Sequence, residues 1–139
     1  MNDRKEYPRP QLVRKEWVNL NGIWDFGFDD QNIGIEEKWF KKSQVFTQSI
    51  NVPYAYQTKL STIEDSSFHD FVWYRREFEV PKSWEGNRTI LHFGAVDYRA
   101  WIYVNEMLVG FHEGGHVSFS FDITNYLTGG TETLVVRVE

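Results

Sequence analysis

The feature that most constrains the fold is a succession of short apolar segments, each about five to eight residues long, that end at proline, glycine or asparagine. Within these segments apolar and polar side chains alternate with a period of two, which is the period of a β-strand. No segment has the apolar spacing of a long helix, and residues 36–42 suffice for only one or two helical turns. The sequence therefore predicts an all-β fold with about eight strands.

Some of these segments indicate how the strands are buried. In residues 20–28, Trp24, Phe26 and Phe28 share one face, which predicts a strand with one aromatic face. In residues 98–105, small aliphatic residues alternate with aromatic ones, so both faces of that strand are expected to be covered. Residues 71–80 are expected to turn their even positions to the core, namely Val72, Tyr74, Arg76, Phe78 and Val80. Together these patterns predict a jelly-roll-like β-sandwich.

The predicted sandwich occupies residues 17–139. Residues 1–16 are polar and interrupted by proline, which predicts an irregular N-terminal arm. The last strand, residues 133–139, is apolar and runs to the final residue, and such a strand is expected to leave an exposed edge that pairs with another chain. We therefore expect the sandwich to be incomplete, or truncated, at its C-terminal edge, and a homo-oligomer is one expected consequence.

Two connections between strands carry information. Asn105 and Glu106 stand between two strand segments, which predicts a two-residue hairpin turn. Residues 58–70 are rich in Ser, Thr, Asp and Glu, which predicts a long surface loop. Because binding residues are often found on such loops, His69 and Asp70 are candidate site residues.

The composition argues against several classes of function. The formal net charge is -5 and the pI is about 5.4, whereas proteins that bind nucleic acid usually carry a clustered basic face. The chain has no cysteine, so it has neither disulfides nor thiolate metal ligands. The first residues are charged and lack an apolar run, which predicts neither a secretory signal nor a membrane span and makes the cytoplasm the expected location.

The string His112-Glu113-Gly114-Gly115-His116 admits two interpretations. As H-E-x-x-H it is the motif of zinc hydrolases, in which two histidines share one face of a helix. However, two glycines in a helix interior cost about 2 kcal/mol relative to alanines, and in a strand the two histidines would stand about 13 Å apart. We therefore interpret the string as a glycine bend between strands, without a metal. His112, Glu113 and His116 then either line a binding rim or are simply solvated.

Aromatic residues make up 17% of the sequence. Their rings can stack on the apolar faces of sugars, but most of them alternate at strand period, so burial in the core is the better default interpretation. A retaining glycosidase needs two carboxylates held about 5 to 5.5 Å apart, and no pair in the sequence identifies itself as such. The residues alone therefore leave both a carbohydrate-binding role and a purely structural one open.

Several short strings occur in a fixed order along the chain. They are Leu20–Phe26 (LNGIWDF), Asn51–Pro53 (NVP), Val72–Arg76 (VWYRR), Val104–Asn105 (VN), Val109–His116 (VGFHEGGH) and Phe119–Thr124 (FSFDIT). In this order they resemble the N-terminal sugar-binding domain of glycoside hydrolase family 2, which includes β-galactosidases, β-glucuronidases and β-mannosidases. The resemblance covers nearly all of residues 17–139.

The resemblance implies a jelly-roll domain of the galactose-binding-domain-like kind, which in the whole enzyme precedes an immunoglobulin-like domain and a TIM-barrel catalytic domain. In that family both catalytic glutamates belong to the barrel, so no catalytic residue and no cofactor are expected in this chain, and the isolated chain should be inactive. The domain shapes the rim of the pocket that takes the carbohydrate substrate. The residues expected at the rim or in domain contacts are His69, Asp70, His112, Glu113 and His116.

The resemblance also bears on the sugar. In the β-galactosidase pattern the bend after the Val-Gly-aromatic strand carries an aspartate that contacts sugar, and the matching position here is Gly114. The His-x-Gly-Gly run is more similar to the β-glucuronidase version. Across the family as a whole, the resemblance implies that the parent enzyme acts on a terminal β-linked galactoside, glucuronide or mannoside. The alternative is a free-standing carbohydrate-binding module.

Overall fold

The computed structural model describes residues 16–139, so the predicted N-terminal arm lies outside the described residues except for Glu16. Eight strands and four short 3₁₀ helices follow one another in this part of the chain. The strands are β1 (Gly22–Phe28), β2 (Gln48–Val52), β3 (Val72–Glu79), β4 (Ile90–Phe93), β5 (Arg99–Val104), β6 (Met107–Glu113), β7 (Phe119–Asp122) and β8 (Thr131–Val138). The short helices are η2 (Trp39–Lys41), η3 (Lys59–Ser61), η4 (Lys82–Trp84) and η5 (Thr124–Tyr126). The all-β prediction is confirmed.

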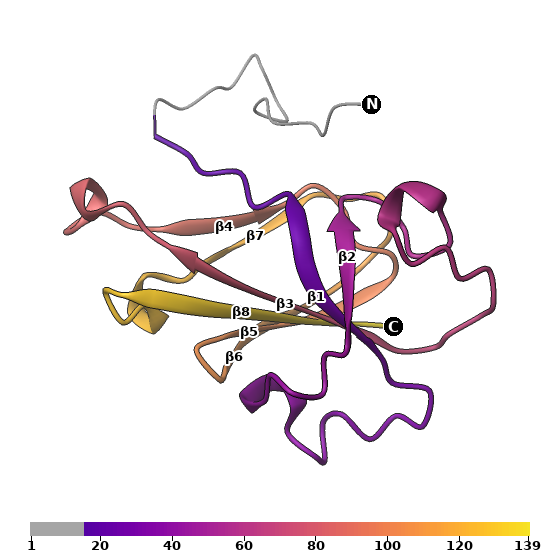
Figure 1. Cartoon of the computed structure of the whole chain (residues 1–139). Coiled ribbons are helices and arrows are strands. Elements are labelled where there is room, and N and C mark those ends of the chain that lie inside the picture. The colour runs from indigo at the N-terminus through magenta and orange to yellow at the C-terminus, as the bar shows by residue number, and fades with distance from the viewer. Residues whose placement is uncertain (1–15) are drawn as a thin grey trace.

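The strands form two antiparallel sheets. The large sheet has six strands in the order β2-β1-β3-β8-β5-β6, and the small sheet pairs β4 with β7. Figure 1 shows the small sheet on one side of the large sheet and the segment between β1 and β2 on the other side. The predicted sandwich is therefore confirmed.

β8 lies in the middle of the large sheet. It pairs with β3 along its whole length, from Val72–Val138 to Glu79–Thr131, and β5 pairs with its other side. The prediction of an exposed terminal edge is therefore wrong, because hydrogen-bonded neighbours occupy both sides of the last strand. The edges of the large sheet are instead β2 and β6.

The main core lies between the two sheets, where the even positions of β1 and β3 meet the small sheet. Its buried residues are Trp24, Phe26, Ile50, Val72, Leu91, Ala100, Ile102, Val104, Ile123, Leu134, Val136 and Val138, and Tyr74 and Phe78 pack against them. Arg76, on the same face of β3, donates a hydrogen bond from Nη1 to the carbonyl oxygen of Leu20 at 2.7 Å. The predicted core faces of β1 and β3 are confirmed, except that Val80 lies beyond the end of β3 and outside this core.

A second core lies on the opposite face of the large sheet. Trp73 is completely buried there, and its indole N–H donates to Oδ2 of Asp29 at 3.0 Å. The segment between β1 and β2 folds over this face and contributes Trp39 and Phe46, while β5 contributes Tyr103. The prediction that both faces of β5 are covered is confirmed. For β3 the prediction was incomplete, because Trp73 is covered by a segment far from it in sequence.

The β5–β6 turn marks one end of the sandwich, which we call the hairpin end. Asn105 and Glu106 both have positive φ, 49° and 71°, as a two-residue hairpin turn of this hand requires. The side chain of Asn105 donates from Nδ2 to Oε1 of Glu132 at 2.9 Å. Glu132 is 1% exposed and also accepts hydrogen bonds from Thr128 and Gly129. A buried carboxylate therefore ties the start of β8 to the hairpin.

Candidate functional site

The strand register brings the predicted site residues to the end of the large sheet opposite the hairpin end. Phe28, at the end of β1, pairs with Val72, at the start of β3. Val72 pairs with Val138, which pairs on its other side with Ala100. Ala100 in turn pairs with His112, near the end of β6. The residues that precede β3 and those that follow β6 therefore lie at the same end of the sheet.

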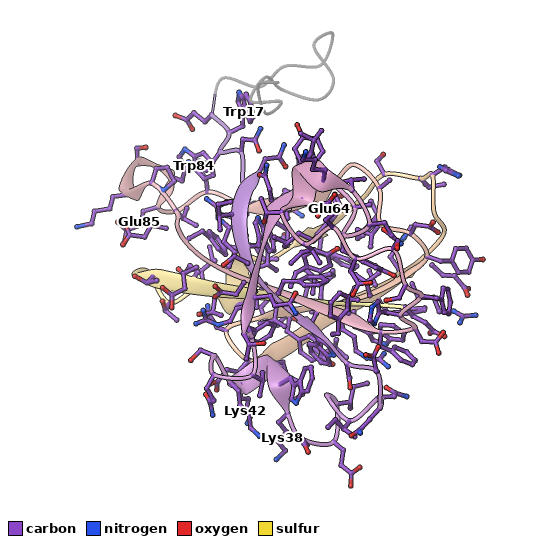
Figure 2. The ribbon with its side chains drawn as sticks, turned by 45° about the vertical axis from the view of Figure 1, so that its right-hand side comes forward. Trp17, Lys38, Lys42, Glu64, Trp84 and Glu85 are labelled. Carbon is purple, nitrogen blue, oxygen red and sulfur yellow. The ribbon has the colours of Figure 1, made fainter. Side chains whose placement is uncertain are left out.

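We call this the loop end; it carries the connections 94–98 and 114–118, both ends of the 29–47 segment and the last residues of the 53–71 connection. The 53–71 connection itself starts at the other end of β1, where Val52 pairs with Gly22. In Figure 1 the 53–71 connection and the C-terminus are on the same, right-hand side of the molecule. Figure 2 labels Glu64 in this connection, well away from Lys38 and Lys42 in the segment between β1 and β2. Neighbouring strands are about 4.8 Å apart, so the start of β3 and the end of β6 are separated by about 14 Å along the sheet.

His69 is the most completely bonded of the predicted residues. Its Nδ1 lies 2.6 Å from Oδ1 of Asp30, and its Nε2 lies 3.1 Å from Oδ2 of Asp65 and 2.9 Å from Oγ of Ser67. The ring stacks on Phe28 with 3.7 Å between centroids. The imidazole therefore joins the end of β1 to the 53–71 connection.

Two opposing effects act on the pKa of His69. Burial lowers it, but hydrogen bonds to Asp30 and Asp65 and the negative charge of both carboxylates outweigh burial and raise the pKa above its usual 6.5. Hydrogen bonds from the side chain and backbone of Ser67 lower the pKa of Asp65. The cluster therefore favours a charged imidazole between charged carboxylates.

Asp70 and Phe68, on either side of His69, are both exposed. The side chain of Asp70 is available to accept hydrogen bonds at the loop end. Phe68 is 85% exposed, the highest value among the large apolar residues of the described chain. Reasoning from the polar loop found Asp70 but missed Phe68, although a lone phenylalanine in a polar stretch was a usable signal.

His112 faces the interior between the two sheets. Its ring stacks on Phe119 of β7 with centroids 4.0 Å apart and planes 11° apart, and Phe119 stacks in turn on Phe93 of β4. Its Nδ1 is buried and has no hydrogen-bond partner among the described residues. The ring of His112 therefore joins the two sheets by packing.

The glycine bend after β6 is confirmed. Gly114 has a φ of 129°, and its N–H donates to the carbonyl oxygen of Tyr98 at 2.9 Å. A Cβ at Gly115 would stand 2.8 Å from Oδ1 of Asp97, so a larger residue at this position would displace the Asp97 side chain. His116 follows and is exposed. Sequence reasoning gave no signal for Asp97, because its contact with the bend depends on the pairing of β5 with β6.

Glu113 is held in an ion-pair group at the ends of three strands. Its Oε1 lies 2.7 Å from Nε of Arg99, and Nη1 of Arg99 lies 3.2 Å from Oε1 of Glu139. Hydrogen bonds to Glu113 and Glu139 raise the pKa of Arg99. The four side chains Glu113, Arg99, Glu139 and the neighbouring Tyr98 form a partly exposed polar surface beside the glycine bend.

Two further observations concern the class of site. Within residues 16–139, no three His, Asp or Glu side chains are grouped so that they could hold a metal ion. His112 lies on a strand, so the helical arrangement of the H-E-x-x-H motif is not formed. No helix in the described part of the chain is long and apolar enough to cross a membrane.

The sequence that forms this fold matches a known family. The profile of the sugar-binding domain of glycosyl hydrolases family 2 matches residues 17–139, and the chain belongs to this family. The resemblance predicted from the sequence strings is therefore confirmed.

Particular relatives are β-glucuronidases and a β-galactosidase. The β-glucuronidase of Paenibacillus borealis is 36% identical over 135 residues, which are 95% of this chain and 22% of that protein. The β-galactosidase of Thermoanaerobacter pseudethanolicus is 30% identical over 122 residues, 87% of this chain and 14% of that protein. The structure of a β-glucuronidase from an uncultured Clostridium sp. matches with a TM-score of 0.74 and 38% identity, over 86% of this chain and 21% of that chain. The chain thus spans only a small part of each relative's length.

Proposed function

We propose that the whole protein is a β-glycosidase acting on terminal β-linked sugars, and that this chain shapes the rim of its active site through the loop end. The observation that carries the proposal is the gathering of His69, Asp70, Glu113 and His116 at one end of the sandwich. Loops held on a rigid scaffold are where binding groups concentrate. The relatives, named as β-glucuronidases and a β-galactosidase, support the same reaction class.

Among the sugars, we infer a β-glucuronide. Two relatives with 36% and 38% identity are named β-glucuronidase, whereas the β-galactosidase is 30% identical. Gly114 occupies the position at which the β-galactosidase pattern carries an aspartate that contacts sugar, and its φ of 129° suits glycine rather than aspartate. This bend therefore supplies no carboxylate to a galactoside.

The chemical step belongs, in this proposal, to polypeptide outside this chain. A retaining glycosidase uses two carboxylates about 5 to 5.5 Å apart, one as acid/base and one as nucleophile. We assign both to a downstream TIM-barrel domain that follows an immunoglobulin-like domain. The isolated chain is therefore expected to bind or position sugar at most, without hydrolysing it.

The test compares residues 1–139 with the product of the complete reading frame on a panel of p-nitrophenyl β-glycosides. We expect turnover by the complete product, fastest with the glucuronide, and none by the fragment. Turnover by the fragment, or a correctly folded complete product that hydrolyses no β-glycoside, would contradict the proposal.

A free-standing carbohydrate-binding module is the second candidate, favoured by the exposed ring of Phe68. It requires a reading frame that ends near residue 139 and sugar binding by this chain alone. Calorimetric titration with β-linked oligosaccharides distinguishes it, since an absence of heat would eliminate this candidate.

A further inference from the structure

The hydrogen bonds of His69 can be counted proton by proton. Nδ1 faces the carboxylate of Asp30, which can only accept, at 2.6 Å. Nε2 faces the carboxylate of Asp65 at 3.1 Å and the hydroxyl of Ser67 at 2.9 Å. An imidazolium has two N–H donors and satisfies both carboxylates at once, whereas a neutral imidazole has only one.

The hydroxyl of Ser67 decides what a neutral ring would do. Its single proton is donated to Asp65 in the observed arrangement. If Nδ1 of a neutral His69 keeps its hydrogen bond to Asp30, Nε2 becomes an acceptor and attracts the Ser67 proton. Asp65 then loses two donors, His69 and the Ser67 hydroxyl, and keeps only the backbone N–H of Ser67 at 2.8 Å.

The aromatic neighbours favour the charged ring as well. The imidazole stacks on Phe28 with planes 19° apart, and it makes a T-shaped contact with Tyr56 at 5.6 Å between centroids. A cation over an aromatic face is stabilised by the ring's negative face. The titratable groups that contact the ring are Asp30, on the connection after β1, and Asp65 and Tyr56, on the 53–71 connection. Neither carboxylate opposes a positive charge.

We propose that His69 is a proton-controlled latch that positions residues 64–70 of the loop end. As an imidazolium it ties Asp65 to Asp30 across the junction with β1, and loss of one proton releases the Asp65 side. Phe68, 85% exposed, lies between Asp65 and His69 in the released segment, so the latch sets where this side chain stands. Asp70 follows His69, which keeps its contact with Asp30. The remainder of the connection has its own support around Ser61, whose Oγ donates to Thr58 and accepts from the N–H of Ile63.

The direction of the pH effect follows from the charges. The pKa of His69 is raised above 6.5 in the folded chain, so the latch is fully closed below about pH 6.5 and opens as the pH rises through the raised folded-state value. Each unit by which the pKa of His69 is higher in the closed form than in the released form, in which the contact with Asp30 remains, corresponds to about a tenfold change in the equilibrium between the two forms. The latch itself does not depend on sugar; its consequence for substrate rests on the function proposed above.

Amide hydrogen exchange of the 139-residue chain without any sugar tests the latch. NMR titration gives the pKa of His69. Between about pH 5 and about pH 9, after correction for intrinsic exchange rates, protection of residues 64–70 should fall by about tenfold per unit of pKa difference between the two forms, following the His69 titration. Protection of β3 and β8 should stay constant. Protection of residues 64–70 that does not change with pH would overturn the proposal.

Two variants separate the latch from a merely structural role. His69→Gln cannot titrate, so residues 64–70 should show low protection at every pH; a wild-type pH profile in this variant would overturn the proposal. Asp65→Asn keeps the Asp30 pair and the fold's packing but removes one carboxylate, so it should lower the pKa of His69 and flatten the profile. An unchanged His69 titration in Asp65→Asn would also overturn it. Since no sugar is present, failure of the proposed glycosidase function would leave these results unaffected.

Discussion

Replacement of Glu132 by glutamine would show how much the hairpin end depends on a buried charge. Oε1 of Glu132 accepts hydrogen bonds from Nδ2 of Asn105 at 2.9 Å and from the N–H and O–H of Thr128, both at 2.7 Å. Oε2 accepts from the N–H of Gly129 at 3.2 Å. The residue is 1% exposed, so water is not available to replace a lost acceptor.

Glutamine has nearly the same shape but only one accepting oxygen. In the place of Oε1, its carbonyl keeps three hydrogen bonds but loses the charge, which weakens each by about 0.5–1 kcal/mol. In the place of Oε2, the amide nitrogen of glutamine faces the N–H of Gly129, so that two hydrogen-bond donors oppose each other at a cost of about 1–3 kcal/mol. Because neighbouring contributions do not add fully, we expect a loss of about 3 kcal/mol in the free energy of unfolding, or about 10 °C in Tm.

Urea unfolding followed by tryptophan fluorescence measures this loss. Glu106→Gln, an exposed carboxylate in the adjacent turn, is the matched control and should change the free energy by less than about 0.5 kcal/mol. A loss below about 1 kcal/mol for Glu132→Gln, with an unchanged m-value, would refute the reasoning, since the donors would then not depend on the charge.

Three further predictions concern the core and its pH dependence. Burial raises the pKa of Glu132, but hydrogen bonds from Thr128, Asn105 and Gly129 outweigh burial and lower the pKa below 4.5. The stabilisation by this carboxylate is therefore present above about pH 4.5 and is lost as the pH falls through the folded-state pKa. In acid, the unfolding free energies of wild type and Glu132→Gln should converge. Gly110→Ala should lower the free energy of unfolding in urea by about 1–3 kcal/mol, because the new Cβ would stand 2.9 Å from Cζ of Phe121 and closer still to its Cε1. Gly130→Ala is the control and should be nearly neutral, because the space around its Cβ is open. His112→Phe keeps the stack on Phe119 and removes a buried nitrogen without a partner in residues 16–139, so stability should be unchanged or up to about 1 kcal/mol higher; a clear loss would contradict the packing role.

Local patterns predicted much of this fold. The alternation through Trp24 and Phe26 gave the buried face of β1, because a strand on a sandwich must turn every second side chain inward. The glycines at 114 and 115 gave the bend after β6, because the helix interior disfavours them. These features depend only on neighbours in sequence.

Features that depend on distant segments were not predicted. The place of β8 between β3 and β5 is set by pairing partners more than 25 residues away, and the apolar composition of the strand is equally consistent with an edge. Burial of Trp73 requires the segment between β1 and β2 to fold over it. His69 was predicted as a site residue, but its partner Asp30 is 39 residues away, so the bonded cluster could not be recognised.

The central claim, that the loop end faces the substrate, is tested most directly by kcat/KM of the complete protein for p-nitrophenyl β-D-glucuronide. Asp70→Asn at the loop end and Glu106→Gln at the hairpin end remove the same charge from exposed positions at opposite ends of the sandwich. We expect Asp70→Asn to lower kcat/KM by about tenfold, the equivalent of one hydrogen bond to a charged group, and Glu106→Gln to leave it within about twofold. Equal values for the two variants, or a loss confined to Glu106→Gln, would contradict the account.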